Sequence, residues 1–234
     1  ADWPFTDPRG LTTRYTYNGF DELASLQSPD TGTTANTYDA AGNLRTSTDA
    51  RGRQATYGYD ALNRVTQVQY SDETLAYAYD DSAGGNAGVG RLTRLTDASG
   101  TTLYRYDLQG RVVEKTQQLL PGTPALTKRV GYNYNALGQL AGMTTPSGQT
   151  VAIAYAADGR IRELRVNGQL IASEIGYFPF GEPKSWRLGN GATYARSFDS
   201  DGRIAAVAGH AGPRPAPYPP PAREEGGSLD VKQQ

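Results

Sequence analysis

Residues 57–65 read Tyr-Gly-Tyr-Asp-Ala-Leu-Asn-Arg-Val, and the same arrangement of residue types returns along most of the chain. Two tyrosines stand two positions apart in this stretch. Because side chains alternate between the two faces of a β-strand, both rings would lie on one face of a strand. In a helix they would point about 200° apart. The stretch therefore predicts a β-strand with one aromatic face.

The second tyrosine of the stretch is an anchor on which the other copies can be aligned. Successive anchors are separated by 21, 21, 20, 27, 28, 21, 22 and 21 residues. The two long steps coincide with a glycine-rich insert at 82–90 and a proline-containing insert at 117–127. A period near 21 residues indicates an array of similar supersecondary units. The anchors are Tyr17, Tyr38, Tyr59, Tyr79, Tyr106, Tyr134, Tyr155, Tyr177 and Phe198.

Glycine, asparagine or aspartate stands four residues after most anchors, and these residues accept a left-handed backbone most easily. They predict a tight turn, which we call the first turn. An aliphatic residue follows two positions later, and a second turn rich in glycine and polar residues comes about eight residues after that. Each unit is thus predicted to be a β-hairpin. The predicted first-turn residues are Asp21, Gly42, Asn63, Gly110, Gly138, Gly159 and Gly202.

One spacing departs from simple alternation. The aliphatic residue after the first turn is often followed by another three positions later, as in Val65 and Val68. A β-bulge or burial on both faces of the strand explains this spacing, and the sequence does not separate the two. A short helix is disfavoured because glycine, asparagine and aspartate recur about every ten residues.

Composition narrows the possible functions. The chain has 23 basic and 24 acidic side chains, so no bulk charge favours nucleic acid. No apolar stretch approaches the ~18 residues of a membrane span. Zero cysteines and one histidine exclude thiolate chemistry, cysteine-ligated zinc and any site of two imidazoles. We expect no enzyme activity, no cofactor and no metal.

The repeated segments resemble the tyrosine-aspartate (YD) repeat of the Rhs family. The likeness is carried by residues 57–65, 104–112 and 198–204, and it covers about residues 5–208. It implies an all-β fold of repeated hairpins that form a continuous curved β-ribbon, part of a spiral shell or cage. Family shells enclose a toxic C-terminal domain in bacterial polymorphic toxins, and animal relatives are cell-surface adhesion proteins.

The resemblance implies a function that needs no catalysis. We expect a structural segment of an Rhs-type toxin shell, secreted or at the bacterial cell surface, whose partners are the remaining repeats and a toxin or other cargo. The alternative is an adhesion module that binds glycan through exposed aromatic residues such as Trp186. A self-cleaving protease is a third class, but its motif matches only Asp7 to Leu11, which lies in phase with the repeat and is interpreted as a turn.

The expected organisation is a β-ribbon at residues 1–208 followed by a proline-rich tail at 209–234. Six of the 14 prolines lie in this tail, which predicts a linker-like or disordered segment and suggests truncation or a changed reading frame. His210, at its start, is expected to be solvated.

The expected ribbon is too small to be a container. About 18 strands at ~4.8 Å each span ~85 Å, which closes into a ring about 27 Å across. A 100-residue cargo is ~34 Å across. The chain is therefore expected to be part of a wall, and its exposed end strands are expected to associate edge to edge when it is alone.

Two sets of charged residues also keep the phase of the repeat. Aspartates after the anchors are expected to accept backbone hydrogen bonds within their own turns, with calcium binding as the minor alternative. Arginines just after the first turn are expected to stack on tyrosine rings and to bridge carboxylates, and single-stranded nucleic acid is the disfavoured alternative. The aspartates are Asp39, Asp60, Asp80, Asp107 and Asp199, and the arginines are Arg64, Arg91, Arg111, Arg160 and Arg203.

Overall fold

The structure is a computed structural model that describes residues 2–119, 126–179 and 181–212. It divides into two units, residues 1–149 and 150–234. The described residues form nineteen strands and one short 3-10 turn, η1 (Ala83–Gly85), so the prediction of an all-β fold of repeated hairpins is confirmed. The first unit contains β1 (Asp2–Thr6), β2 (Thr12–Tyr17), β3 (Leu23–Ser28), β4 (Gly32–Tyr38), β5 (Leu44–Thr48), β6 (Gln54–Tyr59), β7 (Val65–Gln69), β8 (Thr74–Tyr79), β9 (Leu92–Asp97), β10 (Gly100–Tyr106), β11 (Val112–Leu119), β12 (Leu126–Tyr134) and β13 (Leu140–Thr144). The second unit contains β14 (Thr150–Tyr155), β15 (Ile161–Val166), β16 (Gln169–Tyr177), β17 (Pro183–Leu188), β18 (Thr193–Phe198) and β19 (Ile204–His210).

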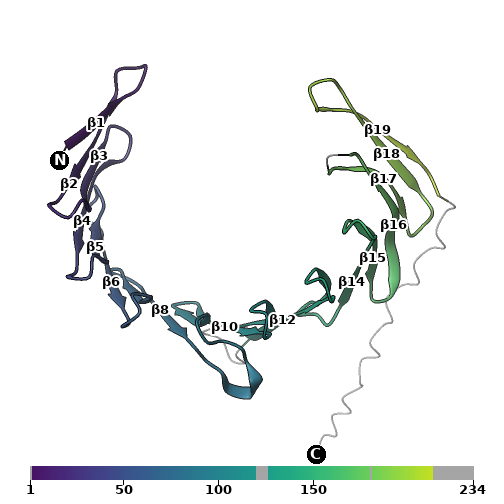
Figure 1. The fold of residues 1–234 in the computed structure, drawn as a ribbon, viewed down its shortest axis with the longest axis horizontal. Coiled ribbons are helices and arrows are strands. Elements are labelled where there is room, and N and C mark those ends of the chain that lie inside the picture. Colours follow the sequence, from purple (N-terminus) through teal and green to yellow (C-terminus); the bar gives the residue numbers. More distant parts are fainter. Residues whose placement is uncertain (1, 120–125, 180, 213–234) are drawn as a thin grey trace, which may run out of the picture. The chain divides into compact units, whose positions relative to one another are not determined.

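Strands pair with their neighbours in the sequence. In the first unit every strand from β1 to β13 is antiparallel to the next, and the strands follow one another in chain order (Figure 1). In the second unit the same holds from β14 to β19. Every connection is local, as expected of a repeat array in which each unit contacts only its neighbours.

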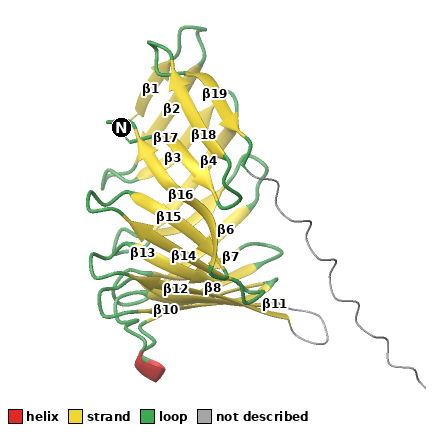
Figure 2. Ribbon diagram, turned by 90° about the vertical axis from the view of Figure 1, so that its right-hand side faces the viewer, coloured by secondary structure: helices red, strands yellow, loops and turns green. Residues whose placement is uncertain are grey.

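The turns gather along two opposite margins of each unit. First turns, which follow the anchors, lie at one margin, and second turns lie at the other, because the strands run across the ribbon (Figure 2). We call these margins the first-turn rim and the second-turn rim. The insert at 82–90, which replaces one first turn and contains η1, belongs to the first-turn rim.

A β-bulge explains the spacing of three between aliphatic residues. Tyr59 pairs with Val65, but the preceding Gly58 pairs with Gln67, so Thr66 is an extra residue in β7. The extra residue returns Val68 to the face of Val65, opposite Tyr57. A register shift occurs just before each of the nine anchors, so the bulge belongs to the repeat and not to a single hairpin.

The sheet is a single layer in which one face is better covered than the other. In β8, Leu75, Tyr77 and Tyr79 are half-buried, whereas Thr74, Ala76 and Ala78 between them are exposed. We call the half-buried side the aromatic face. No large side chain among the described residues is fully buried, and the buried hydrophobic residues there are small: Ala55, Val68, Ala172 and Ala192. The tyrosine rings therefore cover the sheet without a second layer.

The glycine-rich insert is held in place, although its composition suggests a flexible segment. Asn86 is only 5% exposed, and its side-chain oxygen accepts a hydrogen bond of 2.8 Å from the backbone N–H of Tyr106. Ala87 donates its own N–H to the carbonyl of Tyr106 at 3.1 Å, and Arg105 donates to the carbonyl of Gly84 at 2.6 Å. The insert thus extends the ladder at the end of β10, where backbone groups would otherwise lack partners.

Two of the expected segments lie partly outside the described residues. The ends of the insert predicted at 117–127 belong to β11 and β12, and 120–125 are not described. The last described strand ends at His210, which pairs with Thr193 and is exposed. The remainder of the predicted tail, 213–234, lies outside the described residues.

Candidate functional site: the aromatic face and its turns

Each of the nine predicted anchors is the last residue of a strand. They end the even-numbered strands from β2 to β18, immediately before a first turn. Their rings share the aromatic face with the aliphatic residues opposite them, as Tyr79 does with Leu92 and Tyr59 with Val65. The period of about 21 residues in the sequence thus places one anchor ring per repeat along the aromatic face.

Anchor hydroxyls tie consecutive repeats together. The hydroxyl of Tyr79 donates a 2.7 Å hydrogen bond to the carbonyl of Val65, the aliphatic residue of the preceding repeat. The same bond recurs at six anchors and satisfies a carbonyl beside each bulge, where the strand ladder is disturbed. The donor and acceptor pairs are Tyr38 and Leu23 (3.0 Å), Tyr59 and Leu44 (2.9 Å), Tyr79 and Val65 (2.7 Å), Tyr106 and Leu92 (2.6 Å), Tyr134 and Val112 (2.8 Å), and Tyr177 and Ile161 (2.8 Å).

Most first turns are built from one side chain and one left-handed residue, although Ala156 and Phe178 replace that side chain in two of them. Oδ1 of Asp60 accepts hydrogen bonds from the backbone N–H groups of Leu62 and Arg64, at 2.9 and 3.0 Å. Asn18 and Asn135 form the same pair of bonds, so the turn needs the oxygen and not the negative charge. All the predicted turn residues have positive φ: Asp21 (60°), Gly42 (82°), Asn63 (58°), Gly110 (80°), Gly138 (80°), Gly159 (82°) and Gly202 (76°).

Arginines after the first turn stack on the anchor ring of the next repeat. The guanidinium carbon of Arg64 lies 4.3 Å from the centroid of the Tyr79 ring. Such distances favour a cation–π attraction, which a planar guanidinium supplies together with stacking. The other pairs are Arg91 and Tyr106 (5.8 Å), Arg111 and Tyr134 (4.6 Å), and Arg160 and Tyr177 (5.3 Å). Arg203, in the last first turn described, pairs with Asp201 at 3.2 Å instead.

Arg64 joins two repeats through three partners. Its Nε donates to Oδ2 of Asp60 at 2.7 Å, and its two terminal nitrogens donate to both oxygens of Asp80 at 3.1 and 2.6 Å. The same guanidinium covers the ring of Tyr79. These carboxylates raise the pKa of Arg64 above its ordinary value, with Asp80 the larger cause. The aspartates are thus engaged in turns and ion pairs, and the described residues contain no group of three or more potential metal ligands.

Hydrogen bonds within the turns lower the pKa values of the aspartates. The pKa of Asp39 is below its ordinary 3.8, first because the Asn43 side chain donates to it and then because the Asn43 backbone N–H does. The pKa of Asp49 is lowered by the backbone N–H of Arg53 and by its guanidinium. At Asp107, desolvation raises the pKa, but the hydrogen bonds from Arg111 outweigh it and the pKa is lowered.

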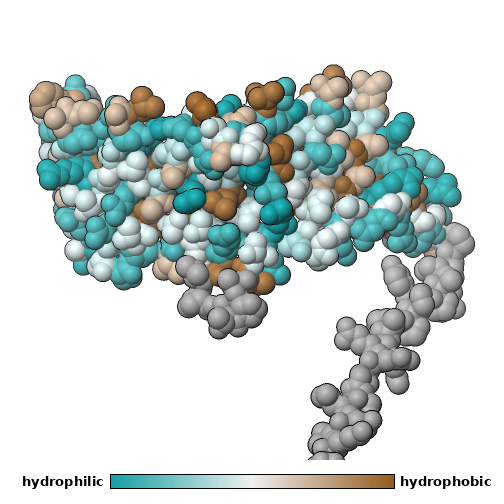
Figure 3. All heavy atoms as spheres, turned by 90° about the horizontal axis from the view of Figure 1, so that it is seen from below, coloured by the Kyte–Doolittle hydropathy of each residue, from teal (hydrophilic) through white to brown (hydrophobic). Residues whose placement is uncertain are grey.

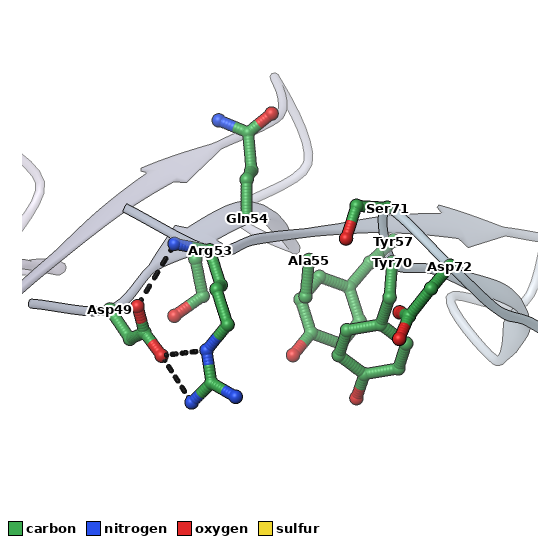
Figure 4. Close-up of a pocket in the computed structure, with 9 residues that line it drawn as sticks. Asp49, Arg53, Gln54, Ala55, Tyr57, Tyr70, Ser71 and Asp72 are labelled. Carbon is green, nitrogen blue, oxygen red and sulfur yellow. Dashed lines mark hydrogen bonds and ion pairs between the residues drawn. The ribbon is translucent and has the colours of Figure 1, made fainter. Parts of the chain in front are cut away.

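One of the pockets in the described residues contains Tyr70, a tyrosine outside the repeat pattern. A cavity of about 350 Å³ is lined by Tyr57 and Tyr70 together with Asp49, Arg53 and Asp72. In Figure 4 the two rings lie between the ion pair of Asp49 and Arg53 on one side and Asp72 on the other. Both tyrosine hydroxyls point to the same side as the Arg53 guanidinium (Figure 4). Burial raises the pKa of Tyr57, and the neighbouring hydroxyl of Tyr70 adds to the shift.

Free polar groups make this pocket suitable for a ligand. Within the described part of the chain, the hydroxyls of Tyr57 and Tyr70 and the carboxylate of Asp72 have no hydrogen-bond partner. Aromatic faces beside hydroxyl donors and a carboxylate acceptor suit a compact polyhydroxylated molecule. The sequence interpretation missed this site because Tyr70 stands outside the tyrosine period, and that irregularity was the only signal.

Trp186, the aromatic residue singled out for glycan, is covered on the sheet. Its ring stacks on Tyr194 with centroids 5.7 Å apart and planes 11° apart, and Arg196 lies 4.8 Å from its centroid. The pocket beside it, about 310 Å³, is lined almost entirely by apolar side chains such as Leu164 and Ile175. These apolar surroundings are suited to packing of the Trp186 ring and less suited to binding a sugar.

A family model matches part of the chain. The RHS Repeat family model matches residues 38–75 and 88–117. No curated protein matches the chain in sequence. None of the described residues forms a helix with the length and apolar character needed to cross a membrane.

Several toxin structures share the fold. A structure of the Tc holotoxin pore of Photorhabdus luminescens is 17% identical, with a TM-score of 0.75 over 90% of this chain and 12% of that one. A crystal structure of TcdB2–TccC3 with Cdc42 is 18% identical, with a TM-score of 0.69 over 85% of this chain and 13% of that one. TcdB2–TccC3 without its hypervariable C-terminal region is 17% identical, with a TM-score of 0.70, over 88% and 13%. At these identities the likeness is one of fold, and the chain spans about an eighth of the length of those chains.

The contribution of the anchor hydroxyl to stability can be tested by removing its oxygen atom alone. We expect Tyr79→Phe to lower the free energy of unfolding by about 1 kcal/mol, because Val65 loses its donor while a ring remains under Arg64. Urea unfolding followed by circular dichroism measures the change. The control is Tyr77→Phe, whose hydroxyl donates no hydrogen bond among the described residues; equal losses in the two variants would refute a special role for the anchor.

The aspartate turns predict an acid-sensitive fold. Because the folded pKa values of Asp39, Asp60 and Asp107 are lower than their ordinary value of 3.8, the charged forms stabilise the fold above about pH 4. This stability is lost as pH falls through the lower folded values. The urea midpoint should therefore stay level from about pH 7 to 5 and fall below about pH 4.

The control for this prediction keeps the turns and removes their titration. Asn18 and Asn135 show that asparagine forms the same turn, so the triple variant Asp39→Asn, Asp60→Asn and Asp107→Asn should fold at pH 7. Its urea midpoint should fall less steeply in acid. An unchanged acid profile in the triple variant would show that these carboxylates do not cause the sensitivity.

Proposed function

We propose that this chain, which contains RHS repeats, is a non-catalytic wall segment of an Rhs-type toxin shell that encloses a toxin or other cargo. The observation that carries the proposal is the anchor bond, because in six repeats the anchor hydroxyl donates to a carbonyl of the repeat before it, as Tyr59 does to Leu44 and Tyr79 to Val65. Further repeats can be added at either end of such an array through the same bond. An array extended in this way forms a continuous sheet, which is suited to be the wall of a shell.

The aromatic face, which is only half-buried, supports an enclosing role. A single-layer sheet in which no large described side chain is fully buried leaves apolar area in contact with water. In a closed shell this area would be protected from solvent or would face the cargo. The chains that share the fold are about eight times as long, which supports a segment of a larger wall.

The chemistry of the turns supports a structural role and no catalysis. The aspartates that would be candidate acids or bases accept backbone N–H groups, and asparagine replaces them in two repeats. A general base cannot be replaced by asparagine. As part of a toxin shell the protein would be secreted or displayed at the bacterial surface, and its partners would be the remaining repeats and the cargo.

Protease protection tests the enclosure. In the full-length protein, the segment that follows the repeats should be cleaved at least about tenfold more slowly than the same segment produced alone, because a closed wall excludes the protease. Tyr59→Ser, Tyr79→Ser and Tyr106→Ser together should restore cleavage by opening the ladder, whereas Tyr77→Phe should not. Equal cleavage of the enclosed and free segments would exclude containment.

A second candidate function is glycan binding at the pocket of Tyr57 and Tyr70. The unpaired hydroxyls and the Asp72 carboxylate in this cavity favour a saccharide over an apolar ligand. This role fits the adhesion proteins that the repeat resembles.

Tyr70→Ala tests this candidate on a glycan array. A glycan bound by the natural chain should lose at least about tenfold in affinity in the variant, because one face of the pocket is removed. Tyr15→Ala, which removes a tyrosine of the aromatic face outside the pocket, should bind as before. If no glycan binds the natural chain, the candidate is excluded.

A further inference from the structure

Arg196 occupies a place where the repeat does not need an arginine. The position two residues before each anchor holds tyrosine in five repeats, as at Tyr77, isoleucine in two, as at Ile153, and asparagine at Asn36. Arginine stands there only at Arg196. Because the same register shift precedes every anchor, the strand pairing accepts an aromatic, an aliphatic or a polar side chain at this position. The hairpin thus leaves Arg196 available for another role.

The guanidinium of Arg196 lacks an acceptor for its donors. Its Nε is buried and has no hydrogen-bond partner. Among the described residues its terminal nitrogens form no hydrogen bond or ion pair either, whereas four other arginines of the second unit lie 2.6–3.8 Å from a carboxylate. The ring of Trp186, whose centroid is 4.8 Å from the guanidinium carbon, contacts the cation but offers it no oxygen. Because a buried donor without an acceptor is unfavourable, Arg196 is suited to bind an anion.

A second bulge in β16 directs a carboxylate away from this arginine. Glu174 and Ile175 together lie opposite Trp186 of β17. Glu174 has a φ of 53°, in the left-handed region that residues other than glycine, asparagine and aspartate rarely adopt. Ala172 lines the pocket beside Trp186, and plain alternation would place Glu174 on the same side. With the bulge, Ile175 lines the pocket instead and Glu174 pairs with Arg187 at 3.3 Å. Backbone strain of this kind is typical of binding sites.

The guanidinium of Arg196 borders an apolar pocket of about 310 Å³. Two rings, those of Trp186 and Tyr177, line it together with aliphatic side chains such as Leu164 and Ile175. On the side of the chain that Figure 3 shows, hydrophobic residues are scattered among hydrophilic and intermediate ones, whereas this lining is apolar almost throughout. An apolar cavity of about 150 Å³ is enough to bind benzene, so this pocket has room for a ring and a short chain.

We propose that this pocket binds a small organic acid, with its apolar body against the rings and aliphatic side chains and its carboxylate on Arg196. A guanidinium can donate from Nε and from a terminal nitrogen to the two oxygens of one carboxylate, which would give Nε the acceptor that it lacks. An inorganic anion would leave the apolar lining in contact with water, and a sugar would leave hydroxyls unpaired against it. A carboxylate on an apolar body satisfies both features of the site.

A further repeat of the same ribbon does not complete this pocket. The strand of Arg196, β18, is already paired on both sides, with β17 and β19, so a repeat added after β19 would extend the sheet beyond it. A side chain of another protein segment also fits the site less well than a free acid. Aspartate and glutamate carry a carboxylate without a large apolar body, and the apolar side chains carry no carboxylate.

Fluorescence titration with hydrocinnamate tests the proposal, because Trp186 lines the pocket and Trp3 is the only other tryptophan of the chain. In a Trp3→Phe background, hydrocinnamate should change the emission of Trp186 in a saturable way. Its uncharged amide has the same apolar body and should bind at least about tenfold more weakly, because a charged acceptor for Arg196 is lost. Acetate has the charge without the body and should not compete with hydrocinnamate.

Two arginine variants separate the site from a general effect of charge. Arg196→Gln should weaken hydrocinnamate binding at least about tenfold and leave binding of the amide unchanged, since only the acid uses the cation. The matched control, Arg187→Gln, removes an arginine that already pairs with Glu174 and should bind the acid like the natural chain. Circular dichroism should show both variants folded, because Asn36 holds the position of Arg196 in another repeat.

Nuclear magnetic resonance of the arginine Nε–H groups gives a measurement that does not depend on fluorescence. The Arg196 resonance should shift on addition of hydrocinnamate and not on addition of the amide. Absence of a saturable response to the acid by both methods, equal affinities for the acid and the amide, or equal losses in the two arginine variants would overturn the proposal.

Discussion

The fold depends on a contact between repeats and not on a core. At six junctions between described repeats an anchor tyrosine donates its hydroxyl to a carbonyl of the preceding repeat, and in four of these an arginine of that preceding repeat covers the same ring. A tyrosine is suited to this place because its ring covers apolar surface while its hydroxyl reaches a polar group. Phenylalanine keeps only half of this function, and Phe198 holds the anchor position in the last repeat described.

The bulge and the first turn make that contact possible. The extra residue in each bulge brings two aliphatic side chains to one face of the strand, as Val65 and Val68 show, and disturbs the ladder beside the first of them. The carbonyl that accepts the anchor hydroxyl lies at this disturbance, so the bulge creates the acceptor and the next repeat supplies its donor. The left-handed residue of the turn sets the strand direction two residues before the bulge begins.

Much of this arrangement could be predicted from the sequence because it repeats. Nine copies in phase identify the anchors, the turn residues such as Gly42 and Asn63, and the arginines that stack on rings, since the same residue type returns at the same place. Features that occur once leave no such signal. Asn86 in the insert and Tyr70 in its pocket act through contacts made by residues 20 and 13 positions away, which spacing alone does not reveal. The bulge is an intermediate case. The spacing of three between aliphatic residues is visible in the sequence, but a bulge and burial on both faces explain it equally well, and only the register of the strands distinguishes them.

A wall without a core gains its stability from neighbours, and this has a consequence for its composition. Each junction adds a similar increment, so the stability of the array rises with the number of repeats and its ends are the least stable parts. Side chains must then reach across junctions, and arginine does so better than lysine because one planar group pairs with two carboxylates and a ring at once, as Arg64 does. The excess of arginine, 19 against 4 lysines, follows from this need and not from binding a polyanion, since acids balance it almost one for one.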